Sequence, residues 1–498
     1  KRAGNLTIGL NASSAERMNM EEGWVVEYSC MSELKGLVSA SAETTLSDLP
    51  DGTPSMRTNS TEWQSTPRDS DGSSRAASIS NSERLHKRRS CIPEALLLKQ
   101  GSFGAAVFSL ASSAIGSGSL ALPYMLKSTG ICSGIVMLVV GAVLSHASLE
   151  VLMVATRRTG SRNLADLVAL ATGQRAARGA VNGVVAVYGV SAVLCCLVFI
   201  GDFFCGIAHS PLIDVQISRS SAICLVAVCV VWPLALPRSL SALRYASALS
   251  IAAIGFITLA VVCKAPAYAA LRQMEGEFAV LGEDGLLWWS GDPRAWLRAF
   301  GIALFAFAAQ TNAVPVACGL HEVDTNQVRW VSLCSMALAL AVYVPLALCG
   351  YLSFRGGTHE DFILNYPDDD VVMLLVRCCC LASMCISVPI NLSPAAQSIA
   401  GFASGALNKH PADLHRGIVT VVVAICTLVA TRSEHIAGII GLIGAGLGSI
   451  VVLVLPALIC RNLLVQSSAP QKAARLSGIL FAASALGFAA FCLQVFNM

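Results

Sequence analysis

Residues 101–130 read GSFGAAVFSLASSAIGSGSLALPYMLKSTG, a stretch apolar enough to cross a membrane but interrupted near its middle by Gly116-Ser117-Gly118-Ser119, with Pro123 shortly after. Glycine tolerates unusual backbone angles, and proline removes a hydrogen-bond donor and clashes one turn back. Irregular backbone survives at membrane depth only where protein buries it or where it lines a wet cavity. Residues 104–126 are therefore predicted to form a broken helix whose unwound centre is half of a binding site. The alternative is that the small residues only let two helices pack closely.

The composition of the chain is that of a multi-pass membrane protein. Its 498 residues are 55% hydrophobic and only 13% charged, whereas a soluble protein carries about 25% charged residues. Stretches of about 20 apolar residues, enough to span a bilayer, recur along the sequence. The net charge of +3 gives no indication of a nucleic-acid partner. Most of the 19 cysteines lie inside apolar segments without ligand spacing, so we expect no disulfide framework and no metal site.

The first 98 residues form a separate region that is rich in serine and charge and has no sustained apolar pattern. Such a composition is typical of disorder. A basic segment at residues 83–89 lies just before the first span, and basic residues flank membrane spans on the cytoplasmic side. Residues 1–98 are therefore predicted to be a disordered cytoplasmic tail, and residues 99–498 the transmembrane domain.

Ten further apolar stretches follow the first one. They lie near residues 131–155, 180–207, 221–238, 245–264, 297–320, 328–354, 371–395, 417–431, 436–460 and 475–496. Arginines concentrate between residues 157 and 178, after the second span, which marks that loop as cytoplasmic. The loops at 265–296 and 355–370 are acidic and are predicted to face the other side. Eleven spans place the C-terminus on that other side.

The sixth span, residues 297–320, is interrupted as well, because Gln310-Thr311-Asn312 falls inside the apolar stretch and Pro315 follows. Broken helices at matching positions of two five-helix halves are typical of secondary transporters with inverted repeats, which bind substrate where the breaks meet. Spans 1–5 and 6–10 are therefore predicted to be the two repeats, with span 11 added.

Several motifs resemble the amino acid/auxin permease family, in the same order as in that family. The first motif is the first span itself. The others are Ile200-Gly201-Asp202, Pro237-Arg238-Ser239-Leu240-Ser241-Ala242-Leu243, Leu304-Phe305-Ala306-Phe307 with Pro315, Gly350-Tyr351-Leu352-Ser353-Phe354, Leu375-Val376-Arg377, Ser387-Val388-Pro389 and Gly441-Leu442-Ile443-Gly444-Ala445. The resemblance covers about residues 102–464. It implies an all-α, LeuT-like fold of eleven helices and transport of amino acids with sodium or protons. We expect a monomer in the plasma membrane or in a vacuolar or lysosomal membrane, with no cofactor besides the coupling ion.

Residues of both breaks make up the predicted substrate site. Unpaired N–H groups and the positive end of a half-helix favour an anion, so the first break is expected to hold the substrate carboxylate. Carbonyls freed before each break are expected to accept from the amine, and polar side chains of the second break to shape the side-chain pocket. The site comprises Ser112, Ser113, Gly116, Ser117, Gly118, Phe305, Ala309, Gln310 and Asn312.

The coupling ion, H⁺ or Na⁺, has three candidate residues. Sodium-coupled members of the family carry an asparagine where this chain has Ser112, together with a hydroxyl residue in the eighth helix that Ser387 can supply. The missing asparagine favours protons or facilitated exchange. Asp202 is an ionisable residue inside a span and is therefore the third candidate, with a hydrogen bond near the end of its helix as the alternative.

Function classes other than transport fit the sequence less well. The serine-rich tail motivates a second hypothesis, an amino-acid sensor that signals through the tail and hardly transports. The sequence has no metal-spaced histidines, nucleophile elbow or phosphate loop typical of an enzyme. It also has no filter-like repeat or charge ring typical of a channel. The sequence therefore predicts a secondary active transporter of neutral amino acids and not an enzyme.

Overall fold

The computed structural model describes residues 101–237, 243–274, 286–320, 325–407, 411–433, 436–464 and 470–496. The chain divides into two compact units, Lys1–Ser90 and Cys91–Met498, and every described residue belongs to the second. The predicted tail, residues 1–98, therefore lies outside the described residues. So do most of the motif after Pro237 and the acidic residues of the loop at 275–285.

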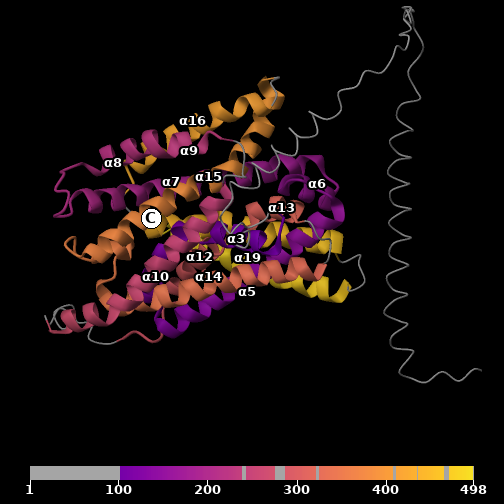
Figure 1. Cartoon of the computed structure of the whole chain (residues 1–498). Helices are drawn as coiled ribbons and strands as arrows, with labels where there is room; N and C mark the ends of the chain where they lie inside the picture. Colours follow the sequence, from indigo (N-terminus) through magenta and orange to yellow (C-terminus); the bar gives the residue numbers. More distant parts are fainter. Residues whose placement is uncertain are drawn as a thin grey trace, which may run out of the picture. The chain divides into compact units, whose positions relative to one another are not determined.

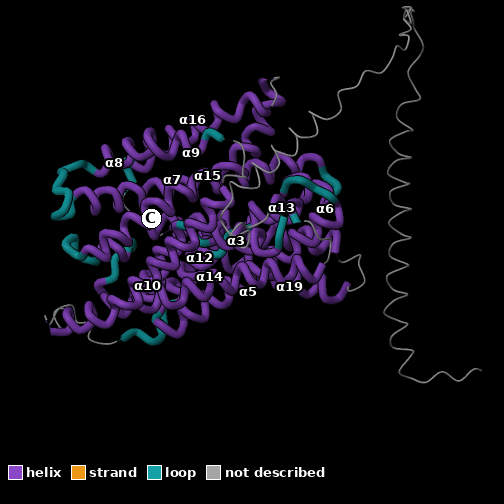
Figure 2. The backbone as a smooth tube through the Cα atoms, viewed as in Figure 1, coloured by secondary structure: helices purple, strands orange, loops and turns teal. Residues whose placement is uncertain are grey.

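The described residues form helices joined by loops, with no strand among them (Figure 2). The elements up to residue 274 are α3 (Phe103–Ala114), η2 (Ser117–Ala121), α4 (Leu122–Thr129), α5 (Ile131–Thr159), α6 (Leu164–Thr172), α7 (Arg175–Ala208), α8 (Arg219–Val226), η3 (Ala227–Val231), α9 (Trp232–Ala235) and α10 (Leu243–Met274). The later elements are α12 (Pro293–Ala306), α13 (Gln310–Gly319), α14 (Thr325–Phe354), η4 (Arg355–Gly357), η5 (Phe362–Asn365), α15 (Val371–Leu407), α16 (Pro411–Ala430), α17 (Ile436–Ile443), η6 (Gly444–Val454), α18 (Leu455–Ile459), η7 (Cys460–Leu464) and α19 (Pro470–Phe496).

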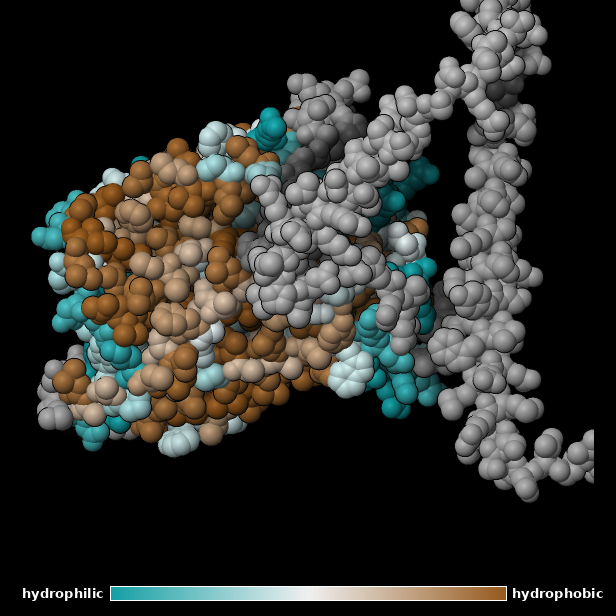
Figure 3. Space-filling model, in the orientation of Figure 1, coloured by the Kyte–Doolittle hydropathy of each residue, from teal (hydrophilic) through white to brown (hydrophobic). Residues whose placement is uncertain are grey.

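Each predicted span corresponds to a helix or helix pair of the described residues. Eight helices are long and apolar enough to cross a membrane, and α3 with the segment η2–α4 forms a further candidate as a bent pair. Two shorter apolar helices, Arg219–Ala235 and Leu414–Ala430, lie where the fourth and ninth spans are predicted. Figure 3 shows a broad hydrophobic surface with polar side chains gathered toward its two ends. The chain is a multi-pass, all-α membrane protein.

Local capping signals fix where several helices begin and end. The hydroxyl of Ser102 accepts the N–H of Ala105 at the start of α3, and the carboxylate of Asp292 caps the start of α12. Gly160 and Gly173 end α5 and α6 in the left-handed conformation, with φ of 70° and 67°. Glycine adopts this conformation without a steric penalty, so the two glycines determine where these helices end.

Small residues allow the closest helix contacts. α7 and α15 make the most extensive contact between described elements and lie side by side in Figure 1. A Cβ added at Gly189 of α7 would lie 2.7 Å from the Cβ of Ala395 of α15. A Cβ added at Gly444 of η6 would lie only 2.0 Å from the carbonyl oxygen of Gly301 in α12. These glycines serve helix packing, because no side chain fits at such distances.

Candidate functional site

The first break separates α3 from η2. Ile115 and Gly116 lie outside both helices, and Gly116 has φ −138° and ψ −147°. A single 3₁₀ turn then leads into α4, where Pro123 occupies the first turn. The two halves meet at an angle of 50°, and the hydroxyl of Ser119 donates to the carbonyl of Gly116 at 2.8 Å. The predicted broken first helix is confirmed.

The second break lies at residues 307–309, between α12 and α13. The sequence put the interruption at Gln310-Thr311-Asn312, but in the structure this triplet begins α13. The side-chain oxygen of Gln310 accepts the N–H of Ala309 at 2.9 Å, so this polar side chain bonds the residue before α13 and does not interrupt the helix. The two halves bend less than those of the first break and form one continuous candidate span, Pro293–Gly319.

One tyrosine joins the two breaks. The hydroxyl of Tyr343 in α14 lies 2.8 Å from the carbonyl oxygens of both Ala114 and Ala306, the last residues of α3 and α12. Its single hydrogen is shared between these two acceptors, and the side chain is fully buried. A Cβ added at Gly118 would lie 2.8 Å from the Cα of Ala306. The two breaks are therefore in direct contact, as an inverted-repeat transporter requires.

Gly116 faces α15 and leaves room for no more than a Cβ before van der Waals contact with it. A Cβ added at Gly116 would have the hydroxyl oxygen of Ser387 as its nearest neighbour, at 3.9 Å. Ser387 donates its hydrogen to the carbonyl of Ser383 at 2.9 Å, which leaves its oxygen lone pairs for another partner. The hydroxyl of Ser112 likewise donates within its helix, to Ser109. Two buried hydroxyl oxygens thus remain available as acceptors near the first break.

Other predicted site residues support the breaks. Ser113 also donates to the carbonyl of Ser109, at 2.9 Å. Ser117 is buried and lies near the thiol of Cys196 in α7. The ring of Phe305 lies 6.2 Å from that of Tyr188, measured between centroids. These contacts fix the first break against α7 and the end of α12.

Gln310 is held inside a hydrogen-bond network and is only 1% exposed. Its side-chain nitrogen donates to the hydroxyl of Ser145 in α5 at 3.0 Å, and Ser145 donates to the carbonyl of Phe307 at 2.7 Å. With the contact to Ala309, both polar atoms of the Gln310 amide are engaged. The amide therefore stabilises the second break from α5.

Asn312 lines a cavity of about 260 Å³ between α6, α7, α13 and α15. The lining also includes Arg162, Asn163, Asp166, Arg178, Asn182, Thr311, Pro315, Ser393, Pro394 and Gln397. Its arginines belong to the group that the charge bias predicts to be cytoplasmic. The cavity therefore reaches the first turn of α13 from that side.

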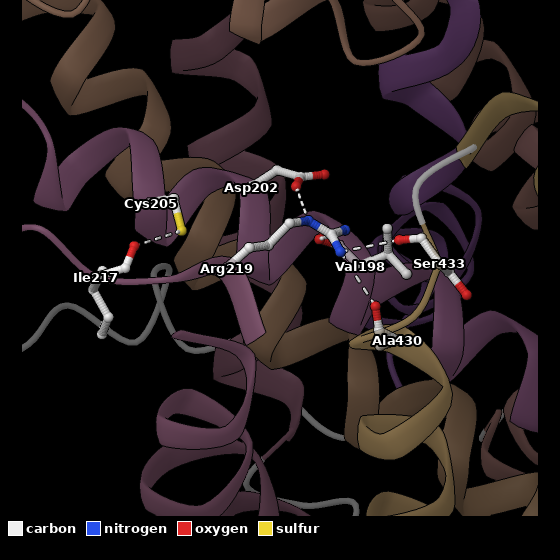
Figure 4. A network of polar contacts seen from close by, with 7 residues as sticks. All are labelled: Val198, Asp202, Cys205, Ile217, Arg219, Ala430 and Ser433. Atoms are coloured by element: carbon white, nitrogen blue, oxygen red, sulfur yellow. Dashed lines mark hydrogen bonds and ion pairs between the residues drawn. The ribbon is translucent and has the colours of Figure 1, made fainter. Parts of the chain in front are cut away.

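Asp202 is bound in an ion pair (Figure 4). Its carboxylate lies 2.5 Å from Nε of Arg219, the first residue of α8. The guanidinium also donates to the carbonyls of Ala430 and Ser433, at 3.2 and 3.0 Å, and of Val198, at 3.4 Å. This network ties α7 and α8 to the end of α16, so the geometry favours the structural alternative for Asp202.

Two residues that contact the breaks, Tyr343 and Ser145, are not among the site residues predicted from the sequence. A tyrosine inside an apolar span needs a partner for its hydroxyl, but the sequence does not tell which carbonyl supplies it. The sequence does not indicate that Ser145 contacts the second break, because a lone serine in a span usually forms its hydrogen bond within its own helix. Among the described residues, no group of three or more potential metal ligands comes together.

Comparisons with known proteins agree with this geometry. The family described as "Transmembrane amino acid transporter protein" matches residues 99–497. One relative is the amino acid transporter AAT1 of Toxoplasma gondii, which is 31% identical over 61% of this chain. Vacuolar amino acid transporter 7 of Saccharomyces cerevisiae is 27% identical over 57% of this chain. Sodium-coupled neutral amino acid transporter 7 of Xenopus laevis is 26% identical, also over 57%. The matches cover 41%, 56% and 63% of these proteins, so the chain spans about half the length of the relatives.

A solved structure confirms the fold. The crystal structure of MhsT in complex with L-phenylalanine superposes with a TM-score of 0.52 at 13% identity, over 79% of this chain and 97% of that one. The LeuT-like fold expected from the sequence, with the first and sixth spans broken, is therefore confirmed. The family match, which covers residues 99–497, shows that the chain belongs to the transmembrane amino acid transporter family, which is a family of transporters and not of enzymes.

Proposed function

We propose that the chain moves neutral amino acids across a membrane by alternating access, binding the substrate's amine and carboxylate between the two breaks. The observation that carries this proposal is the shared hydrogen bond of Tyr343 to Ala114 and Ala306, which brings the carbonyl ends of α3 and α12 to one point. Helix C-terminal ends carry partial negative charge and favour a cation. They support binding of the substrate ammonium group there.

The carboxylate is proposed to bind at the start of η2, where the first N–H groups of a helix have no partner within it. The predicted residues next to the breaks are small or apolar, such as Ser113, Phe305 and Ala309. Since the two backbone groups of an amino acid neutralise each other, such surroundings favour an uncharged side chain. This supports neutral amino acids as the substrate class.

For the coupling ion we favour H⁺ over Na⁺. The hydroxyls of Ser112 and Ser387 offer acceptor oxygens near Gly116, but serine at position 112 lacks the amide oxygen of the sodium-coupled branch. A sodium site then depends on backbone carbonyls for the rest of its ligands. The relatives are named for vacuolar and for sodium-coupled transport, so we propose the plasma membrane or a vacuolar or lysosomal membrane as its location.

Uptake by the purified full chain in liposomes tests the proposal. Labelled neutral, acidic and basic amino acids would be offered with a proton gradient alone and with a sodium gradient alone. We expect neutral amino acids to accumulate when the proton gradient is imposed. Accumulation that requires sodium would overturn the choice of ion. Binding without uptake under either gradient would overturn transport and favour the amino-acid sensor.

A further inference from the structure

The loop between α14 and α15, residues 355–370, packs against the first broken span. Its helical turn η5 contacts η2, and the Lys127 ammonium of α4 donates to the carbonyl of Thr358 at 3.3 Å. Phe362 is fully buried, and its ring lies 3.0 Å from a Cβ added at Gly350 of α14. The loop thus covers the first break on the side predicted to face away from the cytoplasm.

A buried carboxyl group lies inside this covering loop. Asp361 is 2% exposed. Its Oδ1 accepts the N–H of Ile363 at 3.1 Å, whereas its Oδ2 is buried and has no hydrogen-bond partner among the described residues. A buried carboxylate without a counter-charge is far more costly than a neutral carboxylic acid. The packed loop therefore favours the protonated form of Asp361.

The surrounding charges leave Asp361 without a cation of its own. Arg219 is paired with Asp202 at 2.5 Å, and the fully buried Arg377 is paired with Asp368 at 2.5 Å. Two guanidinium groups are thus matched by two carboxylates, and Asp361 is the third acid in their neighbourhood. The other titratable groups in the loop are Arg355, His359, Glu360, Tyr366, Asp369 and Asp370, of which Asp370 is paired with Lys264 at 2.6 Å. Adjoining elements add Lys127 of α4 and Cys380 of α15.

We propose that Asp361 binds a proton when residues 355–370 pack over the first break and releases it when the loop lifts. Acid on that side of the membrane then closes the loop. This inference rests on the proposed function, because alternating access requires this side to open and close. The proton enters and leaves on the same side, so the group sets the pH dependence of closure and is separate from the coupling ion.

The direction of the effect follows from the pKa. Burial raises the pKa of Asp361 well above its ordinary value and Asp202 raises it further, whereas the Ile363 N–H and Arg377 lower it. The packed loop therefore binds the proton more tightly than the lifted, hydrated loop. The proton therefore stabilises the packed loop fully when the pH is below the pKa that Asp361 has in the lifted loop. This stabilisation is lost as the pH rises through the higher pKa that Asp361 has in the packed loop.

Hydrogen exchange of the full chain in lipid nanodiscs tests this proposal, with rates corrected for the intrinsic effect of pH. In the wild type, protection of residues 355–370 is expected to fall as pH rises from acidic to neutral. Asp361→Asn should keep the loop protected at every pH, because the amide stays neutral. Asp369→Asn, an exposed position in the same loop, is the matched control and should behave as the wild type. Equal pH dependence in wild type and Asp361→Asn would overturn the proposal.

A second variant covers the case in which Asp361→Asn does not fold. Asp202→Asn removes a negative charge that raises the pKa of Asp361, so the midpoint of loop opening should move to lower pH, by on the order of one pH unit. An unchanged midpoint would contradict the proposal. The outcomes also separate the two claims: a pH-dependent loop without uptake refutes only transport, and uptake with a pH-independent loop refutes only the proton site at Asp361.

Discussion

The two glycines of the first break have different tasks at the scale of single residues. Gly118 touches the backbone of the second break, with a Cβ position 2.8 Å from the Cα of Ala306. At Gly116 an added Cβ would fit, with the hydroxyl oxygen of Ser387 in van der Waals contact at 3.9 Å. The sequence predicted both as carboxylate-binding residues and did not distinguish them. The packing alternative thus holds for one glycine, while the other remains free to contact a substrate.

Gly118→Ala is expected to destabilise the protein by about 1–3 kcal/mol, because the added methyl group meets backbone that cannot move aside. Gly116→Ala, two residues away, should leave the free energy of unfolding nearly unchanged. Thermal unfolding of the two purified variants in the same detergent checks this. Equal melting temperatures would show that the breaks do not pack as described.

Tyr343→Phe removes the shared donor and leaves two buried carbonyls with one partner fewer. We expect a loss of about 1–3 kcal/mol in stability together with slower uptake, since the breaks are no longer joined. Tyr124→Phe is a suitable control, because the structure shows for Tyr124 only a contact of Lys127 with its ring. Wild-type stability and uptake in Tyr343→Phe would contradict the role of the hydroxyl.

At the scale of elements, the ion pair of Asp202 and Arg219 holds three helices together (Figure 4). The sequence placed Asp202 in a span and could give it either a role in coupling or a structural one. In the structure, the ion pair with Arg219 favours the structural role of Asp202. Arg219 lies seventeen residues further along the chain, beyond a loop. Such a pairing depends on how α8 turns back on α7, which hydrophobic periodicity does not specify.

Asp202→Asn and Arg219→Gln are each expected to lower stability, because each leaves one charged partner unpaired at a partly buried site. The double variant should lose less than the sum of the two single losses, which is the signature of a direct pair. Melting temperatures of the four proteins give this coupling. Additive losses of stability would mean that the two groups do not interact. If uptake by Asp202→Asn no longer depended on protons, Asp202 would have a role in ion coupling.

The second break shows where sequence reasoning about elements reaches its limit. Polar residues and a proline in an apolar span correctly indicated an interruption near Gln310. The sequence did not give its exact start, because the Gln310 side chain bonds the N–H of Ala309 and the hydroxyl of Ser145 in α5 and so lies within α13. That contact joins residues 165 positions apart in the chain. It becomes visible only when α5 and α13 are packed together.

For the whole molecule, hydropathy and charge predicted the class, the positions of the spans and the two broken helices, because each is a local property of the chain. The packing of α7 on α15 and the covering loop at 355–370 could not be predicted, since both are tertiary contacts. The sidedness of the membrane domain rests on the charge bias alone.

Glycosylation mapping tests this sidedness. A sequon on a flexible linker inserted in the exposed segment 211–216, between α7 and α8, is expected to be glycosylated in cells. The same insertion after the exposed Gly173, between α6 and α7, should remain unmodified, because the arginines nearby place it in the cytoplasm. Modification of the second site alone would invert the orientation and move the covered side of the first break to the cytoplasm.

Binding and uptake by Gly116→Val test most sharply whether the substrate is held between the two breaks. The valine side chain would extend beyond a Cβ that already lies 3.9 Å from the Ser387 hydroxyl, so we predict loss of both amino-acid binding and uptake with the melting temperature preserved. Gly255→Val in α10, where an added Cβ meets nothing within 4 Å, is the matched control and should bind and transport as the wild type. Unchanged binding and uptake in Gly116→Val would contradict the account.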